Sequence, residues 1–184
     1  MRARFLVAGV AIAAGVAAAV IVPAVRPASS AEPTVLLAVA LAPPRAAEPV
    51  VHRFKGYAGK CITVPGTTDA PDGAGVVLRA CSDSPRQVFT GTALGEARTL
   101  NGMCLDVAWN SPDNGTKVQV AKCSGGPAQR WYVTGENGAP TGLYNHTTHK
   151  CVDVKAWNDS DGAPLQMWDC VPGQANQTWA LVGA

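Results

Sequence analysis

Residues 151–179 read CVDVKAWNDSDGAPLQMWDCVPGQANQTW, with two cysteines 19 residues apart and a final Gln-Thr-Trp. Residues 104–131 and 61–89 have the same organisation, each with a cysteine pair followed by a Gln-x-aromatic tripeptide. The two cysteines of each pair are 20, 19 and 19 residues apart along the chain. The separations between the first cysteine of each pair and the glutamine of the tripeptide are 26, 25 and 26 residues. Spacing this regular indicates three copies of one structural unit.

Each copy has the pattern of short β-strands. In the third copy, alternating apolar and polar segments are separated by turns rich in Gly, Pro, Asn and Asp. These segments are Leu143–Thr147, Lys150–Lys155, Pro164–Cys170 and Thr178–Val182. Four strands per copy predict an all-β fold of about twelve short strands, with repeats at about residues 50–96, 97–140 and 141–184.

Composition excludes several classes of protein. The chain has 184 residues, of which only 15% are charged, and its 15 basic and 13 acidic residues give a net charge of +2. That balance does not fit a nucleic-acid-binding protein, which would carry a clustered basic surface. Because no stretch has a convincing 3.6-residue period, a helical bundle is also excluded.

The N-terminus has the features of a secretory signal. Arg2 and Arg4 precede an uncharged apolar run over Phe5–Val22, and small residues follow at Ala28–Ala31. We expect cleavage after residue 31, an Ala/Pro-rich linker over 32–49, and no stable membrane span after cleavage. The alternative is an uncleaved N-terminal membrane anchor, since the run is near the lower length limit for spanning.

Six cysteines in a secreted chain predict disulfides. Repeat symmetry selects, from 15 possible connectivities, the pairs Cys61–Cys81, Cys104–Cys123 and Cys151–Cys170. The sequence has no C-x-x-C spacing, so we expect no metal site.

The threefold Gln-x-Trp pattern with paired cysteines resembles the ricin B-type lectin domain, over about Val50 to Ala184. Only Phe89 departs from the Trp of the motif. The resemblance implies a β-trefoil, which is a six-stranded barrel capped by three hairpins, with disulfides within the repeats. It also implies a carbohydrate partner, either galactose-type sugars or a plant or microbial polysaccharide, and no cofactor.

The third repeat has the groups that a sugar site needs. Asp153 and Trp168 lie two residues inside Cys151 and Cys170, so each faces the same side as its cysteine. Antiparallel strands around this bridge would make Asp153 and Trp168 opposing positions. We expect the strands to diverge into the loop Ala156–Ala163, which would leave a shallow cleft between carboxylate and indole.

The resemblance assigns the roles in this site. Asp153 would accept hydrogen bonds from two sugar hydroxyls and Trp168 would stack on the sugar ring. Gln166 and Asn176 would contact further hydroxyls, and Gln177 would hold Asp153 in place. Independently of the resemblance, Trp157 in the intervening loop is a further candidate for lining the cleft.

The other two repeats depart from this pattern. The second keeps Asp106, Gln119 and Gln129 as a weaker possible site, but has Ala121 and Ala128 at the ring and amide positions. The first has Thr63, Val77, Arg79 and Arg86 in place of the acid, Gln, aromatic and Asn, so we expect it to be structural only.

The sequence therefore predicts a secreted, non-catalytic carbohydrate-binding lectin with its main site in the third repeat. Catalysis is not expected, because glycoside hydrolysis needs paired carboxylates flanking one bond and the nearby Asp159 and Asp161 lie on a turn-like loop. The alternative from another class is a trefoil that binds a protein through its loops, such as a secreted protease inhibitor.

Overall fold

The computed structural model describes residues 49–67, 69–133 and 141–184. The predicted signal, residues 1–31, and all of the predicted linker except Pro49 lie outside these residues. The predicted domain, from residue 50 onward, is described apart from residues 68 and 134–140.

Four strands from each repeat build the domain. The first repeat supplies β1 (Val50–Lys55), β2 (Cys61–Thr63), β4 (Val77–Arg79) and β5 (Phe89–Gly91). The second supplies β6 (Ala97–Arg98), β7 (Met103–Val107), β8 (Val118–Lys122) and β9 (Trp131–Val133). The third supplies β10 (Thr141–Asn145), β11 (Lys150–Val154), β12 (Leu165–Asp169) and β13 (Thr178–Gly183). A two-residue strand, β3 (Ala74–Gly75), is additional, so the all-β prediction is confirmed.

Short 3-10 turns connect these strands. They are η1 (Tyr57–Gly59), η2 (Pro85–Gln87), η3 (Leu100–Gly102), η4 (Ala108–Asn110), η5 (Pro127–Gln129), η6 (Lys155–Trp157) and η7 (Ala175–Gln177). Three of them, η2, η5 and η7, end in the glutamine of the Gln-x-aromatic motif. Across the part of the chain that the structure describes, no helix is long and apolar enough to cross a membrane.

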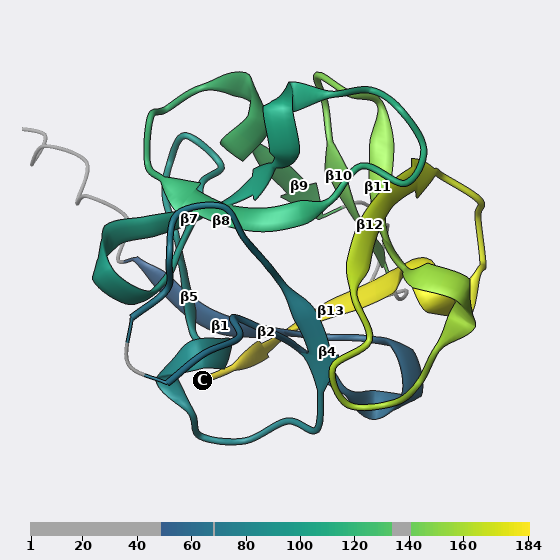
Figure 1. The fold of residues 1–184 in the computed structure, drawn as a ribbon, viewed down its shortest axis with the longest axis horizontal. Helices are drawn as coiled ribbons and strands as arrows, with labels where there is room; N and C mark the ends of the chain where they lie inside the picture. The colour runs from purple at the N-terminus through teal and green to yellow at the C-terminus, as the bar shows by residue number, and fades with distance from the viewer. Residues whose placement is uncertain (1–48, 68, 134–140) are drawn as a thin grey trace, which may run out of the picture. The chain divides into compact units, whose positions relative to one another are not determined.

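The strands pair antiparallel in a threefold arrangement. The first strand, β1, pairs with the last, β13, and also with β5, while β10 pairs with β9 and β13. Three hairpins, β2/β4, β7/β8 and β11/β12, each carry one disulfide. In Figure 1, β4, β8 and β12 surround the centre of the domain. This is the β-trefoil architecture that the resemblance implied.

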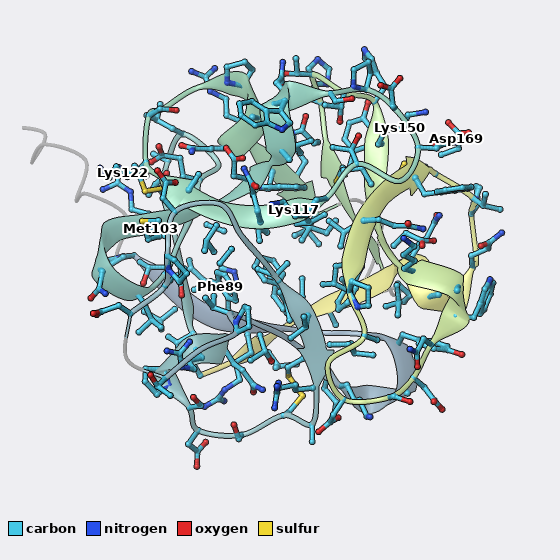
Figure 2. The ribbon with its side chains drawn as sticks, viewed as in Figure 1. Phe89, Met103, Lys117, Lys122, Lys150 and Asp169 are labelled. Atoms are coloured by element: carbon cyan, nitrogen blue, oxygen red, sulfur yellow. A yellow bond between two sulfur atoms is a disulfide. The ribbon has the colours of Figure 1, made fainter. Side chains whose placement is uncertain are left out.

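Equivalent positions of the three hairpins fill the core. In every hairpin, the apolar pair at one equivalent cross-strand position is completely buried. These residues are Ile62 and Leu78, Leu105 and Val120, and Val152 and Met167. Phe89, Trp131 and Trp179, the motif aromatics, are buried in the same cluster, and Figure 2 shows Phe89 among the inner side chains. One core shared by three repeats fixes where each hairpin presents its polar face.

Candidate functional site

All three predicted disulfides form, and they share one register. The first cysteine of each hairpin pairs across the ladder with the residue two positions before the second cysteine: Arg79, Ala121 or Trp168. The second cysteine lies just beyond the end of its strand, and the Cα atoms of the bridged cysteines are 5.0–5.1 Å apart. The disulfide is therefore diagonal to the ladder.

This register corrects the expectation that Asp153 opposes Trp168. Asp153 pairs with Gln166, and Trp168 pairs with Cys151. The strands do not diverge after the bridge, because ladder pairing continues to Val154 and Leu165. The Gln166 amide fills the position across from the acid, so the carboxylate and the indole are diagonal neighbours on one face of the hairpin.

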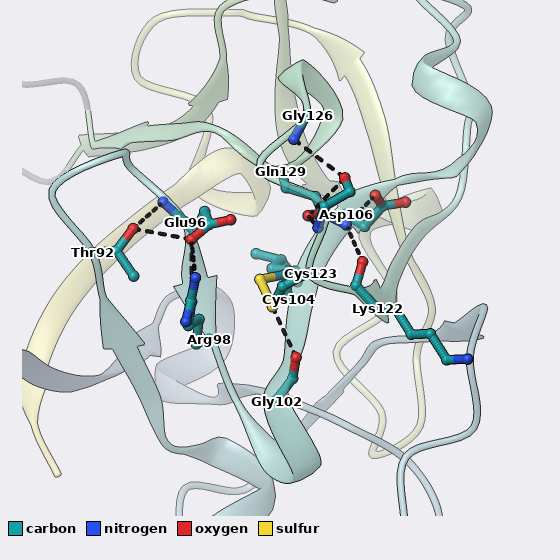
Figure 3. Close-up of a disulfide and its surroundings, with 12 residues drawn as sticks. Thr92, Glu96, Arg98, Gly102, Cys104, Asp106, Lys122, Cys123, Gly126 and Gln129 are labelled. Atoms are coloured by element: carbon teal, nitrogen blue, oxygen red, sulfur yellow. Dashed lines mark hydrogen bonds and ion pairs between the residues drawn. A yellow bond between two sulfur atoms is a disulfide. The ribbon is translucent and has the colours of Figure 1, made fainter.

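The motif glutamine holds the second cysteine of each repeat in the same way. Gln177 accepts a hydrogen bond from the Val171 N–H (2.9 Å) and donates to the Asp169 carbonyl (3.0 Å), on either side of Cys170. Gln129 makes the equivalent pair of bonds around Cys123 (Figure 3), and Gln87 does so around Cys81. Since all three repeats share this clamp, it has a structural role.

In the third repeat the clamp is joined to a buried acid. The Asp153 carboxylate accepts amide N–H groups from Gln166 (2.9 Å, to Oδ1), Asn176 (2.7 Å, to Oδ2) and Gln177 (3.1 Å, to Oδ2). The residue is 4% exposed. Of the five residues predicted for this site, the structure thus brings four into one hydrogen-bonded cluster, which we call the Asp153 cluster.

Two acceptors in the Asp153 cluster have unused capacity. A carboxylate offers about four acceptor positions, and the three amides leave one at Oδ1. Asn176 Oδ1 is buried and finds no hydrogen-bond partner among the described residues. Sugar hydroxyls are donors of the kind that both acceptors need.

Trp168 supplies the apolar surface beside these acceptors. It follows Gln166 by two residues on β12, on the same face, and its side chain is 40% exposed. Trp157, the further candidate, turns elsewhere: its ring packs edge-on against Tyr57 of the first repeat, with centroids 5.9 Å apart. The stacking partner in this hairpin is therefore Trp168.

A contact from the second repeat, which the sequence did not predict, fixes the end of β12. Asn114 donates to the Asp169 carboxylate (2.6 Å) and accepts from the Asp169 N–H (2.9 Å), and Lys150 forms an ion pair with the same carboxylate. Figure 2 shows Lys150 and Asp169 together at the edge of the domain. No sequence pattern indicates this contact, because Asn114 is 55 residues away along the chain.

The second repeat holds its acid in a similar but incomplete cluster. Asp106 accepts from Gln119 (2.9 Å) and Gln129 (3.1 Å), and burial raises the pKa of its carboxyl group against the effect of these two bonds. Ala121 stands opposite Cys104, where the third repeat has Trp168. The structure thus brings the three predicted residues together without a ring beside them.

Neither repeat shows a grouping that suits a metal ion. Within residues 49–67, 69–133 and 141–184, no three His, Cys, Asp or Glu side chains lie close enough to bind one.

Comparisons with known proteins agree with the β-trefoil fold. The model of the ricin-type β-trefoil lectin domain matches residues 51–179. Serine protease 1 of Rarobacter faecitabidus is 36% identical over 125 residues, which are 68% of this chain and 22% of that protein. The chain thus spans about a fifth of the length of that relative.

Two solved structures have the same fold. The designed threefold-symmetric protein ThreeFoil has a TM-score of 0.67 and 27% identity, over 73% of this chain and 99% of that one. The hemolytic lectin CEL-III has a TM-score of 0.61 and 25% identity, over 72% of this chain and 30% of that one.

Proposed function

The chain belongs to the ricin-type β-trefoil lectin family, and from this premise we propose that it is a secreted, non-catalytic carbohydrate-binding protein. Its main site is the third-repeat hairpin, formed by Asp153, Gln166, Trp168, Asn176 and Gln177. The ligand is a galactose-type sugar or a plant or microbial polysaccharide.

The observation that carries this proposal is a held carboxylate next to a half-exposed indole. Three amides fix Asp153 in position, so its free acceptor capacity is already oriented before a ligand arrives. Trp168 offers a rigid apolar face for the C–H side of a pyranose, and a ring of this kind loses little conformational entropy on binding. The combination suits a sugar, which has hydroxyls on its edges and an apolar face.

The same contacts support a role in binding rather than hydrolysis. Retaining and inverting glycosidases need two carboxyl groups placed across one bond. Asp161, an acid in the loop that follows η6, forms an ion pair with Lys60 (2.8 Å). It also accepts a hydrogen bond from the Ala80 N–H (3.1 Å), and both partners belong to the first repeat. Its carboxylate is therefore engaged with another repeat and not with Asp153.

Secretion is proposed from the N-terminal pattern together with the three disulfides. All six cysteines of the chain are paired, as is usual for proteins of oxidising compartments. The leader, the linker and the cleavage after residue 31 are parts of this proposal.

The test is the affinity of the purified oxidised protein for a galactose-type ligand, measured with Trp168→Ala and Asp153→Ala variants. We expect each change to weaken binding at least about tenfold, which corresponds to about 1.4 kcal/mol. Unchanged affinity in both variants, with the fold intact, would reject the third-repeat site. It would favour the protein-binding alternative, to be followed by capture of partners from culture supernatant.

A further inference from the structure

The first repeat has a cavity where the third repeat has the Asp153 cluster. The cavity measures about 320 Å³ and is lined by Thr63, Arg79, Ser82, Arg86, Gln87 and Asp161, among others. Thr63 and Gln87 are the counterparts of Asp153 and Gln177, and they are hydrogen-bonded to each other in the same way (2.9 Å). This volume is near the lower end of small-ligand sites and is large enough for one sugar unit.

The charge of this cavity is opposite to that of the third-repeat site. Where the third repeat has an acid, the first has the Thr63 hydroxyl. Where it has the Trp168 ring and the Asn176 amide, the first has the guanidinium groups of Arg79 and Arg86. The exchange removes one negative charge and adds two positive charges at equivalent places.

Arg86 is a buried cation without a counter-ion. Its Nε and Nη1 donate to the carbonyls of Val64 (3.0 Å), Pro65 (2.8 Å) and Thr67 (2.8 Å), and the residue is 9% exposed. Its Nη2 is buried and has no hydrogen-bond partner among the described residues, and none of their acids forms an ion pair with it. A buried charge that lacks a counter-charge is unfavourable, so an anion would be stabilised here.

Arg79 extends the positive charge to the mouth of the cavity. It is exposed, and no acceptor in the described ranges receives a hydrogen bond from its guanidinium. The acid that lines the cavity, Asp161, is paired with Lys60, and this bond holds the pKa of its carboxyl group below its ordinary value. Arg79 also acts on the Asp161 carboxylate, but three cations, Lys60, Arg79 and Arg86, face this one acid, so the cavity keeps an excess of positive charge.

We propose that this first-repeat cavity binds an anionic substituent of a saccharide, a carboxylate or a sulfate. The fork of N–H groups on a guanidinium matches both anions. Ser82 and Ser84, which also line the cavity, offer hydroxyl groups to the neutral hydroxyls of the same sugar unit. This cavity is separate from the third-repeat site. The first repeat, which has Thr63 in place of the acid, would bind a negatively charged group of the ligand.

The test compares three sugars that differ only at C6: galactose, galacturonate and galactose 6-sulfate. Binding is followed by NMR titration of the oxidised Trp168→Ala protein at 50 mM NaCl, so that the proposed neutral site is already disabled. We expect galacturonate or galactose 6-sulfate to bind at least about fivefold more tightly than galactose, and the tighter of the two identifies the anion. The preference should weaken at 500 mM NaCl, because salt screens exposed charges.

Arg79→Gln in the same background should lower the affinity for the preferred anionic sugar about fivefold. Arg130→Gln is the matched control, because it removes an exposed arginine of the second repeat, and it should leave the affinity unchanged. Asp161→Asn should raise the affinity, because it removes the negative charge at the cavity. Arg86 is a poor first variant because its bonds to three carbonyls hold residues 64–67.

The proposal is overturned if neither anionic sugar binds better than galactose, or if Arg79→Gln and Arg130→Gln have equal effects. Failure of the third-repeat site is distinguishable, because it would appear as the absence of galactose binding in the protein with Trp168 intact.

Discussion

One glutamine in each repeat connects the motif of the sequence to the geometry of the fold. Its amide bonds the backbone on both sides of the second cysteine and reaches the side chain two residues after the first cysteine. In the third repeat that side chain is Asp153, so Gln177 has a structural contact and a contact within the proposed site. In the first repeat it is the neutral side chain of Thr63, so Gln87 makes the backbone clamp without a bond to a buried carboxylate.

Gln87→Ala should lower the free energy of unfolding by about 2–4 kcal/mol, because it removes three hydrogen bonds of a buried amide, to Thr63, Ala80 and Ser82. Chemical denaturation of the oxidised protein measures this. Gln119→Ala, which removes one bond to Asp106, is the control and should cost about 1 kcal/mol. Equal effects of the two substitutions would refute the structural role of the clamp.

His52 makes stability depend on pH. It is buried on β1 beside Phe54, and desolvation lowers its pKa below the ordinary 6.5, against a smaller raising effect of its hydrogen bond to the Val50 carbonyl. The unfolded chain therefore takes up a proton near pH 6.5 that the folded protein resists. This contribution to stability is present above about pH 6.5 and is lost as the pH falls through the folded pKa.

His52→Phe should remove this dependence. The melting temperature of the unaltered protein should fall relative to that of the variant when the pH is lowered from 7.5 to 5.5. Thermal unfolding at both pH values measures the difference in melting temperature between the two proteins. The contributions of the other histidines are the same in both and cancel in this difference. A difference between the two proteins that does not change with pH would contradict the assignment to His52.

At the scale of elements, the sequence predicts the side-chain directions in the hairpins but not the register of their strands. Alternation predicted the strands and the shared face of Asp153 and Trp168, because side-chain direction follows a two-residue period. The register was wrong because the cysteines were assumed to oppose each other, whereas each second cysteine lies past its strand. A disulfide tolerates a range of placements, so spacing alone does not fix the ladder.

Removing a disulfide separates stability from binding. Cys104→Ala with Cys123→Ala, and Cys151→Ala with Cys170→Ala, should each cost about 3 kcal/mol, because each bridge closes a loop of about 20 residues. Only the third-repeat pair should also weaken sugar affinity, because Gln177 clamps the chain around Cys170. Denaturation and ligand titration measure the two effects, and an unchanged affinity in the Cys151/Cys170 double variant would contradict the account.

At the scale of the whole domain, the repeats depend on one another. The pairing of β1 with β13 joins the first repeat to the last, and backbone bonds connect the hairpins, such as Leu78 N–H to the Ala163 carbonyl (2.8 Å). Repeat spacing predicted three equivalent units, but not these contacts. Asn114 with Asp169, and Lys60 with Asp161, meet only when the repeats assemble.

Because the core is continuous, substitutions in different repeats should have the same kind of effect. Leu78→Ala and Met167→Ala each empty a fully buried position and should each cost about 2–5 kcal/mol. Both should still give one cooperative transition, with fluorescence and circular dichroism coinciding. Separate transitions, or loss of one repeat alone, would show that the repeats unfold independently.

The central claim is that the third repeat is a sugar site, and a glycan array tests it most directly. The array compares the purified oxidised protein with its Trp168→Ala variant. Trp109→Ala is the control, because that residue is an indole 96% exposed in the second repeat. We predict selective binding that Trp168→Ala abolishes and Trp109→Ala retains, with melting temperatures close to that of the unaltered protein. Binding that survives Trp168→Ala, or its absence in all three folded proteins, would contradict the claim.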